Sequence, residues 1–219
     1  MKIVFPRRLP GKSAHLKLAP EHRVISLIKE QAPPAIARES AVLILMLEPE
    51  NGRTIDIGGK RVPDWDILFV KRNTYDGVHS GQVAFPGGKC DEEDADYLAT
   101  ACREIFEELG IERDRYEIAG QLTKLYVPPS NFTIYSFVAF VKGSVDIIPD
   151  HREVSNYYLF PLSMFNGSNI FNCKVKAGSY EHVDAPGYWI DGEIIWGATA
   201  MIVTELYEIL TSISSYRWR

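Results

Sequence analysis

The chain has 219 residues, of which 46% are hydrophobic and 24% are charged, a composition typical of a globular protein with a sizeable core. Its formal net charge is −5, and this acidic balance argues against a general nucleic-acid binder, which would carry a basic face. A phosphate-bearing small molecule is not excluded, because a bound divalent cation can supply positive charge locally.

The cysteines and the N-terminus indicate a compartment. Cys90, Cys102 and Cys173 are odd in number and have no metal-like spacing, which predicts reduced thiols. The first residues are basic but have no apolar segment behind them, and no stretch approaches the length of a membrane span. We therefore expect a cytoplasmic protein with no membrane partner and no nucleic-acid partner.

The first 38 residues predict an irregular arm with one short helix around Glu21–Gln31, which two prolines end. Residues 39–219 are expected to form one domain. Its first strands are predicted at Ala41–Leu47 and Asp66–Lys71, which are apolar runs of strand length. The polar, glycine-containing segment between them indicates a hairpin or a longer loop.

The remaining elements alternate strands with helices. A short strand at residues 82–85 precedes a helix predicted from Asp91 to Leu109. Further elements are then expected: strands at Tyr116–Val127, Thr133–Val141 and Tyr157–Phe160, a hairpin at Asp191-Gly192 between Tyr188–Ile190 and Ile194–Trp196, and a helix from about Ala198 to Ile213. This order predicts an α/β fold in which helices cover a mixed sheet.

The predicted helix at Asp91–Leu109 carries an acidic face. At about 100° per residue, its apolar side chains fall in one seam, and the three glutamates Glu104, Glu107 and Glu108 gather elsewhere. Such like charges repel one another, and Arg103 is the only cation near them in the sequence. Two interpretations are open: a solvated acidic surface, or a site for Mg²⁺ or Mn²⁺, which prefer oxygen ligands.

Glycines on both sides of this helix favour the metal site. Pro86-Gly87-Gly88 precedes it, and the absent side chains let the backbone approach a metal or a phosphate. Gly110 is a natural residue to end the helix just beyond the glutamates.

The segment from Gly88 to Ile111 resembles the Nudix box, usually written G-x5-E-x7-R-E-U-x-E-E-x-G-U with U apolar. Residues 103–111 match the second half at every specified position. The first half departs from the pattern, because Asp94 stands in place of the Glu and eight residues, not seven, separate it from Arg103. The resemblance implies a Nudix α/β/α sandwich with a mixed sheet and a metal-dependent hydrolase that cleaves a diphosphate.

The longer spacing with Asp resembles the coenzyme A diphosphatase subgroup of that family. The approach to the box resembles it too, with His79-Ser80-Gly81 followed by Gln82-Val83-Ala84-Phe85-Pro86-Gly87-Gly88. The similarity covers roughly residues 40–215, and its specific part is 68–111. It implies that coenzyme A or an acyl-coenzyme A is cleaved to adenosine 3′,5′-bisphosphate and (acyl-)4′-phosphopantetheine.

Two alternatives remain beside this substrate. The segment before His79 lacks the basic residue that the subgroup often carries, and Pro128 lies seventeen residues past Ile111, near the position where ADP-ribose diphosphatases carry a proline. An ADP-ribose or other nucleotide-sugar diphosphatase is therefore one alternative. A catalytically silent, nucleotide-binding regulatory domain is the other, although such domains usually lose the box glutamates.

The box supplies the candidate catalytic residues, Glu104, Glu107 and Arg103. Glu104 and Glu108 lie one turn apart and are predicted to bind the metal, with Glu107 as a third ligand or as a base acting on metal-bound water. Arg103 is predicted to orient a glutamate or Asp94 by charge-assisted hydrogen bonds, with direct phosphate contact as the alternative.

Substrate contacts are predicted from the residues around the box. Gly88 either ligates the metal through its carbonyl, as the resemblance implies, or only permits the turn. The predicted contacts are Gly87, Gly88, Lys71, Arg72 and His79, against the alternatives of a solvated strand end and a structural histidine. Glu153 is a further carboxylate placed to reach the metal. The expected partner is a small nucleotide metabolite, and a homodimer is left open.

Overall fold

An eight-stranded mixed sheet forms the centre of the molecule in a computed structural model that describes residues 5–29, 33–57, 59–73, 81–177 and 180–211. Its main path runs β10-β4-β1-β9-β7, made of Val154–Pro161, Asp66–Arg72, Arg38–Leu47, Phe132–Val141 and Tyr116–Gln121. β1 and β9 are parallel, and the other pairs on this path are antiparallel. Short strands add to it: β5 (Val83–Ala84), β6 (Gly87–Lys89) and β8 (Leu125–Val127).

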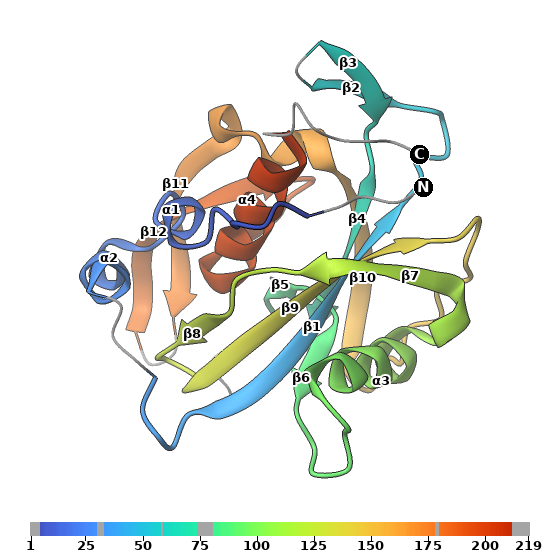
Figure 1. Cartoon of the computed structure of the whole chain (residues 1–219). Coiled ribbons are helices and arrows are strands. Elements are labelled where there is room, and N and C mark those ends of the chain that lie inside the picture. Colours follow the sequence, from blue (N-terminus) through green and yellow to red (C-terminus); the bar gives the residue numbers. More distant parts are fainter. Residues whose placement is uncertain (1–4, 30–32, 58, 74–80, 178–179, 212–219) are drawn as a thin grey trace.

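The apolar side chains of the sheet alternate between two cores. Leu43 and Leu45 of β1 pack in the core that contains α3 (Tyr97–Leu109), whereas Ile44 and Met46 pack in the core that contains α4 (Gly197–Thr211). Successive side chains of a strand point to opposite faces, so a strand covered on both faces becomes a continuous apolar run. Figure 1 shows α3 and α4 on opposite sides of the sheet, which confirms the predicted α/β/α sandwich.

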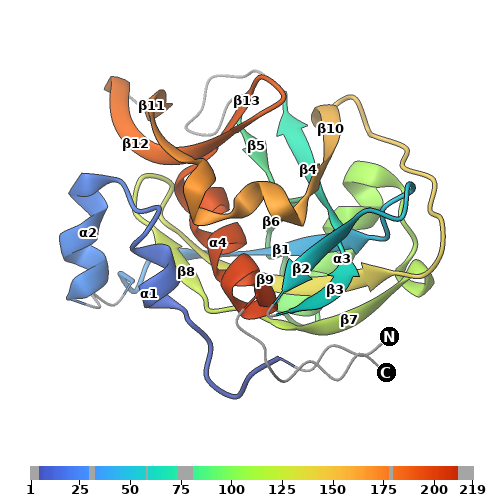
Figure 2. The same ribbon diagram turned by 90° about the horizontal axis from the view of Figure 1, so that it is seen from above.

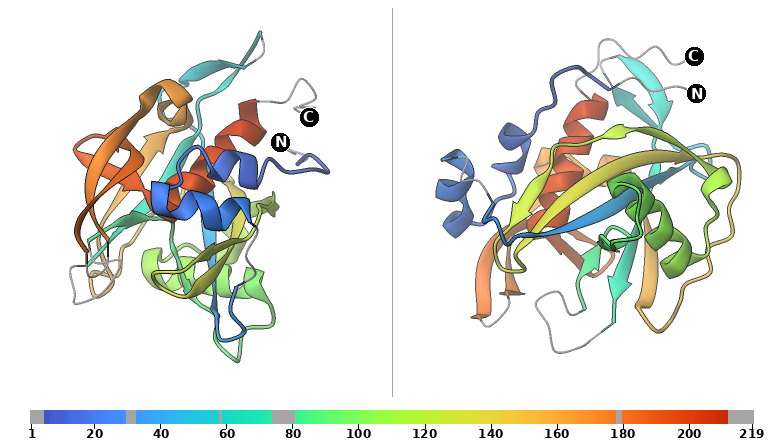
Figure 3. Two further views of the ribbon diagram at one scale, coloured as in Figure 1. Left: turned by 90° about the vertical axis from the view of Figure 1, so that its left-hand side faces the viewer. Right: turned by 60° about the horizontal axis from the view of Figure 1, so that its bottom comes forward.

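A second, antiparallel sheet covers the side of α4 that faces away from the main sheet. It consists of β11 (Ile170–Ala177), β12 (Tyr180–Ile190) and β13 (Glu193–Trp196), drawn in orange to red in Figure 3. Its side chains Tyr188, Ile190 and Ile195 belong to the α4 core. The predicted hairpin at Asp191-Gly192 is confirmed, with φ of 50° and 85° as a tight hairpin turn requires.

The N-terminal arm packs against α4. It holds two helices, α1 (Lys12–His15) and α2 (Glu21–Ile28), where the sequence predicted one. Leu18 and Ala19 between them are buried in the α4 core, and Figure 2 shows α1 beside α4 and α2 farther out from it. The four residues of α1 are too short to give a helical period, which is why the sequence did not show it.

Several boundaries differ from the prediction. The helix expected from Asp91 begins at Tyr97, because Asp96 caps it by accepting a hydrogen bond from Ala99 N at 2.7 Å. The strand expected at 116–127 is divided into β7 and β8. The segment before β4, for which the sequence predicted a hairpin or a longer loop, is a hairpin of β2 (Thr54–Ile57) and β3 (Lys60–Pro63). Short 3-10 helices lie at Arg113–Arg115, Leu162–Phe165 and Gly167–Asn169. No helix among the described residues is long and apolar enough to cross a membrane.

Candidate active site

Two consecutive glycines bring β6 close to the glutamates of α3. Gly87 and Gly88 pair with Val42 and Ala41 of β1. A Cβ added to Gly88 would overlap the carboxylate of Glu104, and a Cβ added to Gly87, whose φ is +148°, would overlap the Ala41 carbonyl. Glycine is required at position 87, where a side chain would meet the backbone of β1, whereas a side chain at position 88 would displace the Glu104 carboxylate.

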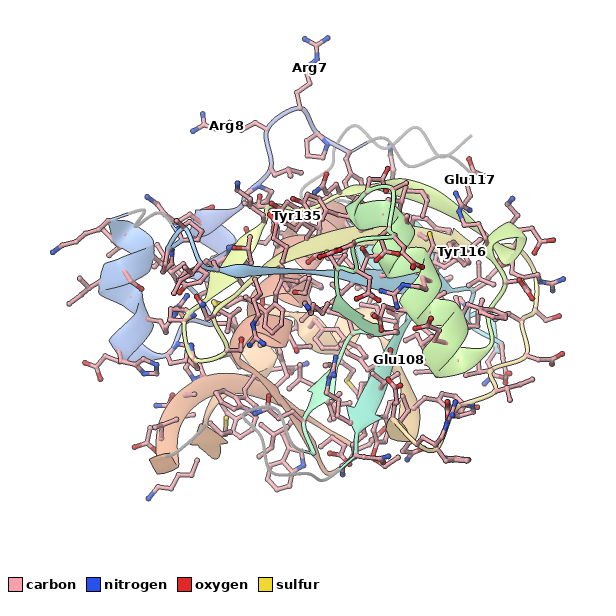
Figure 4. The ribbon with its side chains drawn as sticks, turned by 90° about the horizontal axis from the view of Figure 1, so that it is seen from below. Arg7, Arg8, Glu108, Tyr116, Glu117 and Tyr135 are labelled. Carbon is pink, nitrogen blue, oxygen red and sulfur yellow. The ribbon has the colours of Figure 1, made fainter. Side chains whose placement is uncertain are left out.

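Glu108 is the most deeply placed of the three glutamates. It is 2% exposed, and its Oε2 accepts a hydrogen bond from Gly87 N at 3.0 Å. Figure 4 labels it on α3, beside the strands. Burial raises the pKa of Glu108 to about 7, and the charge of Arg72 and the Gly87 hydrogen bond oppose this shift. For Glu108, the interpretation as a solvated acidic surface is therefore wrong.

Arg103 joins the two halves of the box. Its Nε and Nη2 donate to the two carboxylate oxygens of Asp94 at 3.1 Å each, and its Nη1 donates to Glu104 at 2.9 Å and to Glu107 at 2.8 Å. These bonds hold the pKa of Asp94 down at about 2. The extra residue between Asp94 and Arg103 thus leaves the two in contact. This is the geometry that the predicted orienting role of Arg103 requires.

The carboxylates suit a hard divalent cation by their chemistry and by their repulsion. Burial raises the pKa of Glu104, and the neighbouring charges of Glu107 and Glu153 raise it further. Glu108 also senses the charges of Glu104 and Glu153. Within the described part of the chain, no three such side chains are gathered closely enough to hold an ion as they stand. Arg103 lies between Glu104 and Glu107, so these side chains would have to turn toward an ion.

The other predicted substrate contacts are placed differently from one another. Arg72 Nη2 donates to Gly87 O at 2.7 Å and lies at the glycine strand. Lys71 Nζ instead donates to Glu193 Oε1 at 2.6 Å, so this cation already has a carboxylate partner. His79 lies outside the described residues.

A cavity of about 390 Å³ opens beside the glycine strand. Its lining includes Arg72, Gly87 and Gly88 and is largely apolar. Arg23 of α2 and residues 196–199 at the start of α4 also line it. Sequence reasoning did not find Arg23, because nothing in the arm's composition distinguishes one basic residue from another.

Known proteins are similar to this chain over the part that contains the box. The family model described as NUDIX domain matches residues 38–176. A Nudix hydrolase NudL of Yersinia enterocolitica is 31% identical over 145 residues, covering 66% of this chain and 73% of that protein, and one of Photorhabdus laumondii is 29% identical over 153 residues, covering 66% and 76%.

Solved structures share the fold. A Nudix hydrolase from M. smegmatis, RenU, gives a TM-score of 0.53 at 12% identity, covering 90% of this chain and 94% of that one. A MutT/nudix family protein from Enterococcus faecalis gives a TM-score of 0.53 at 14% identity, covering 91% and 73%.

Proposed function

The chain belongs to the NUDIX domain family and is a hydrolase that acts on diphosphate bonds, and from this premise we propose that its substrate is coenzyme A or an acyl-coenzyme A. The products would be adenosine 3′,5′-bisphosphate and (acyl-)4′-phosphopantetheine. The observation that carries the proposal is the lining of the cavity, which includes Arg72 and Gly87 beside the box glutamates and is otherwise largely apolar. Such walls suit an adenine ring and a long uncharged arm.

Glu104 and Glu108 would hold Mg²⁺ or Mn²⁺, with Glu107, Glu153 and the Gly88 carbonyl as the further oxygens nearby. A divalent cation bound there would neutralise charge on the diphosphate and lower the pKa of a water molecule. Arg103 would orient Glu104 and Glu107, because its guanidinium already donates to both carboxylates. Arg72 would contact the diphosphate from its position at Gly87.

Three features support coenzyme A over ADP-ribose. Asp94 with the longer spacing and the Gly81–Gly88 approach resemble the coenzyme A subgroup. The third is the cavity, whose lining includes a second cation, Arg23 of α2, besides Arg72, and Figures 1 and 2 show α2 well apart from β6. We propose, in addition, a cytoplasmic enzyme with a substrate-contacting arm at 1–38, a hydrolase domain at 39–219, and no nucleic-acid or membrane partner.

A comparison of substrates tests this proposal. The protein is incubated with Mg²⁺ or Mn²⁺ and, separately, coenzyme A, an acyl-coenzyme A, ADP-ribose, NADH and a dinucleoside polyphosphate, and kcat/KM is measured for each. We expect the highest value for coenzyme A or its acyl form. A clear preference for ADP-ribose would overturn the substrate and keep the chemistry. Metal binding without any cleavage would favour a silent regulatory domain.

A further inference from the structure

Arg23 is a buried cation with an unused donor. It is 7% exposed, although it lies on the short surface helix α2. Its Nη2 donates to Tyr126 O at 2.8 Å, but its Nη1 has no hydrogen-bond partner. No carboxylate among the described residues forms an ion pair with it. Burial lowers the pKa of this guanidinium, as expected where a charge has lost water without gaining a counter-ion. A buried donor without a partner is rare in folded proteins and calls for an explanation.

Arg23 lines the cavity beside the glycine strand, and the start of α4 lines this cavity too. Gly197 has a φ of +60°, and Ala198 and Thr199 follow it in the first helical turn. The amides of a first turn have no partner inside their helix, and together with the helix dipole they favour an anion. Arg23 and the first turn of α4 are thus two independent sources of donors in the lining of one cavity.

The charge of the cavity agrees with these donors. Its described lining contains the cations Arg23, Arg72 and Lys89 and no aspartate or glutamate. Arg72 lies at the glycine strand and faces Glu108, so it belongs to the end where the diphosphate is cleaved. Arg23 and the start of α4 have no such role. Their cationic and amide donors would fit a phosphate monoester, which has three strong acceptor oxygens.

We propose that Arg23 and the first turn of α4 form a second anion subsite, which binds a phosphate monoester on the substrate at a distance from the diphosphate that is cleaved. This inference rests on the proposed function and extends it, because coenzyme A carries such a phosphate on its ribose, whereas ADP-ribose and dephospho-coenzyme A lack one. The subsite would make the N-terminal arm a determinant of specificity. A substrate without this phosphate would leave the buried guanidinium unpaired, which is a strong basis for discrimination.

Binding to the metal-free protein tests the subsite without relying on turnover. Adenosine 3′,5′-bisphosphate, ADP and AMP are titrated into the wild type and into Arg23→Gln, Arg23→Lys and Ala198→Pro by calorimetry. Proline is tolerated in the first turn of a helix, so Ala198→Pro removes one amide donor and keeps α4. Arg115→Gln is the matched control, because Arg115 also donates to a backbone carbonyl, that of Ser144, and does not line the cavity.

We expect the wild type to bind the bisphosphate at least about tenfold more tightly than ADP or AMP, and Arg23→Gln to lose that advantage while its affinity for AMP stays unchanged. Arg23→Lys should lose part of it, because the ammonium keeps the charge but not the fork of donors. Ala198→Pro should weaken the bisphosphate alone, and this variant decides the matter if Arg23→Gln does not fold. The subsite is overturned if the wild type and Arg23→Gln prefer the bisphosphate over ADP and AMP to the same extent, or if the wild type shows no such preference.

Turnover separates this inference from the proposed function. The ratio of kcat/KM for coenzyme A over dephospho-coenzyme A is measured in the same variants. A ratio that collapses in Arg23→Gln and survives in Arg115→Gln supports the subsite. If ADP-ribose is the preferred substrate of the wild type, the proposed function fails, and the bisphosphate titration still decides whether the subsite exists.

Discussion

His15 and Glu205 are in direct contact although 190 residues separate them, with His15 Nε2 2.9 Å from Glu205 Oε2 and both side chains buried. The other carboxylate oxygen, Oε1, accepts hydrogen bonds from Gly11 N at 3.1 Å and from Thr123 Oγ1 at 2.7 Å. One carboxylate thus fastens the arm, the connection between β7 and β8, and α4 to one another. A buried carboxylate is tolerated only while such partners remain in place.

Replacing Glu205 with Ala should lower the free energy of unfolding by about 3 kcal/mol, because it leaves the buried donors of His15, Gly11 and Thr123 without an acceptor. The change is measured by denaturant unfolding. Lys17→Ala is the control. Lys17 pairs with Glu208, which lies in α4 as Glu205 does. The Lys17 side chain is 57% exposed, so its removal should lower the free energy of unfolding by no more than about 1 kcal/mol. Equal losses in the two variants would contradict the role given to Glu205.

Replacing Glu104 or Glu108 with Gln should abolish turnover and leave the fold intact. Each change removes a charged oxygen from the metal site, and the loss of repulsion should keep or raise the apo Tm, since burial already disfavours the charge of both side chains. Activity and Tm are measured with and without Mg²⁺. Glu92→Gln, an exposed position before α3, should behave as the wild type.

Metal binding should appear as a rise in Tm that a chelator reverses. At a free Mg²⁺ concentration near 100 times Kd, the native state gains about 2.7 kcal/mol. Glu108→Gln should lose most of this gain. If the wild type and both glutamine variants turn over and respond to Mg²⁺ alike, the glutamates do not form the metal site.

Gly88→Ala should reduce kcat at least about tenfold with little change in Tm. The added Cβ overlaps only the end of the flexible Glu104 side chain, which can turn away without disturbing the backbone. The carboxylate would then leave the position that the metal requires. Gly167→Ala is a suitable comparison, because a Cβ there meets nothing within 4 Å, and both activity and Tm should be unchanged. A fully active Gly88→Ala enzyme would show that the Glu104 position is not critical.

In the metal-free protein, Asp94→Asn should make the free energy of unfolding less dependent on pH in the acid range. The pKa of Asp94 is lowered to about 2 by Arg103, so its carboxylate stabilises the fold above the unfolded value near 4 and loses that contribution as pH falls from 4 to 2. Partial exposure to solvent reduces the effect to about 1 kcal/mol. Unfolding free energies of the wild type and the variant should differ at pH 6 and converge near pH 2. A constant difference across this range would exclude Asp94 as the titrating group.

The sequence predicted the elements that have a strong pattern. β1 and β4 are apolar runs because helices cover both faces of the sheet, and the end of α3 is set by Gly110, whose φ is +68°. The short α1 and β6 have no pattern of their own and form because neighbours hold them. β6, for example, is three residues long and exists through its pairing with β1.

The sequence predicted which residues form the site, but not how deeply each of their side chains is buried. Glu107 and Glu108 are adjacent on one helix, yet the Glu107 side chain is 52% exposed and Glu108 is 2% exposed. That difference comes from β6, which packs against only one side of α3. Partners distant in sequence were equally hidden. Lys71 is paired with Glu193, and Arg23 reaches the cavity only because the arm folds back on β8 and α4.

The order in which the cavity walls are synthesised has a consequence for the nascent chain. Arg23 is synthesised before the first turn of α4, and 190 residues separate His15 from Glu205. At translation rates of about 5 to 20 residues per second, roughly 10 to 40 seconds pass between the synthesis of His15 and that of Glu205 in α4. The cavity therefore cannot be complete until the start of α4 has been synthesised. A chain that stalls before α4 would present the apolar arm, with Leu18 and Ala19 uncovered, to chaperones and proteases.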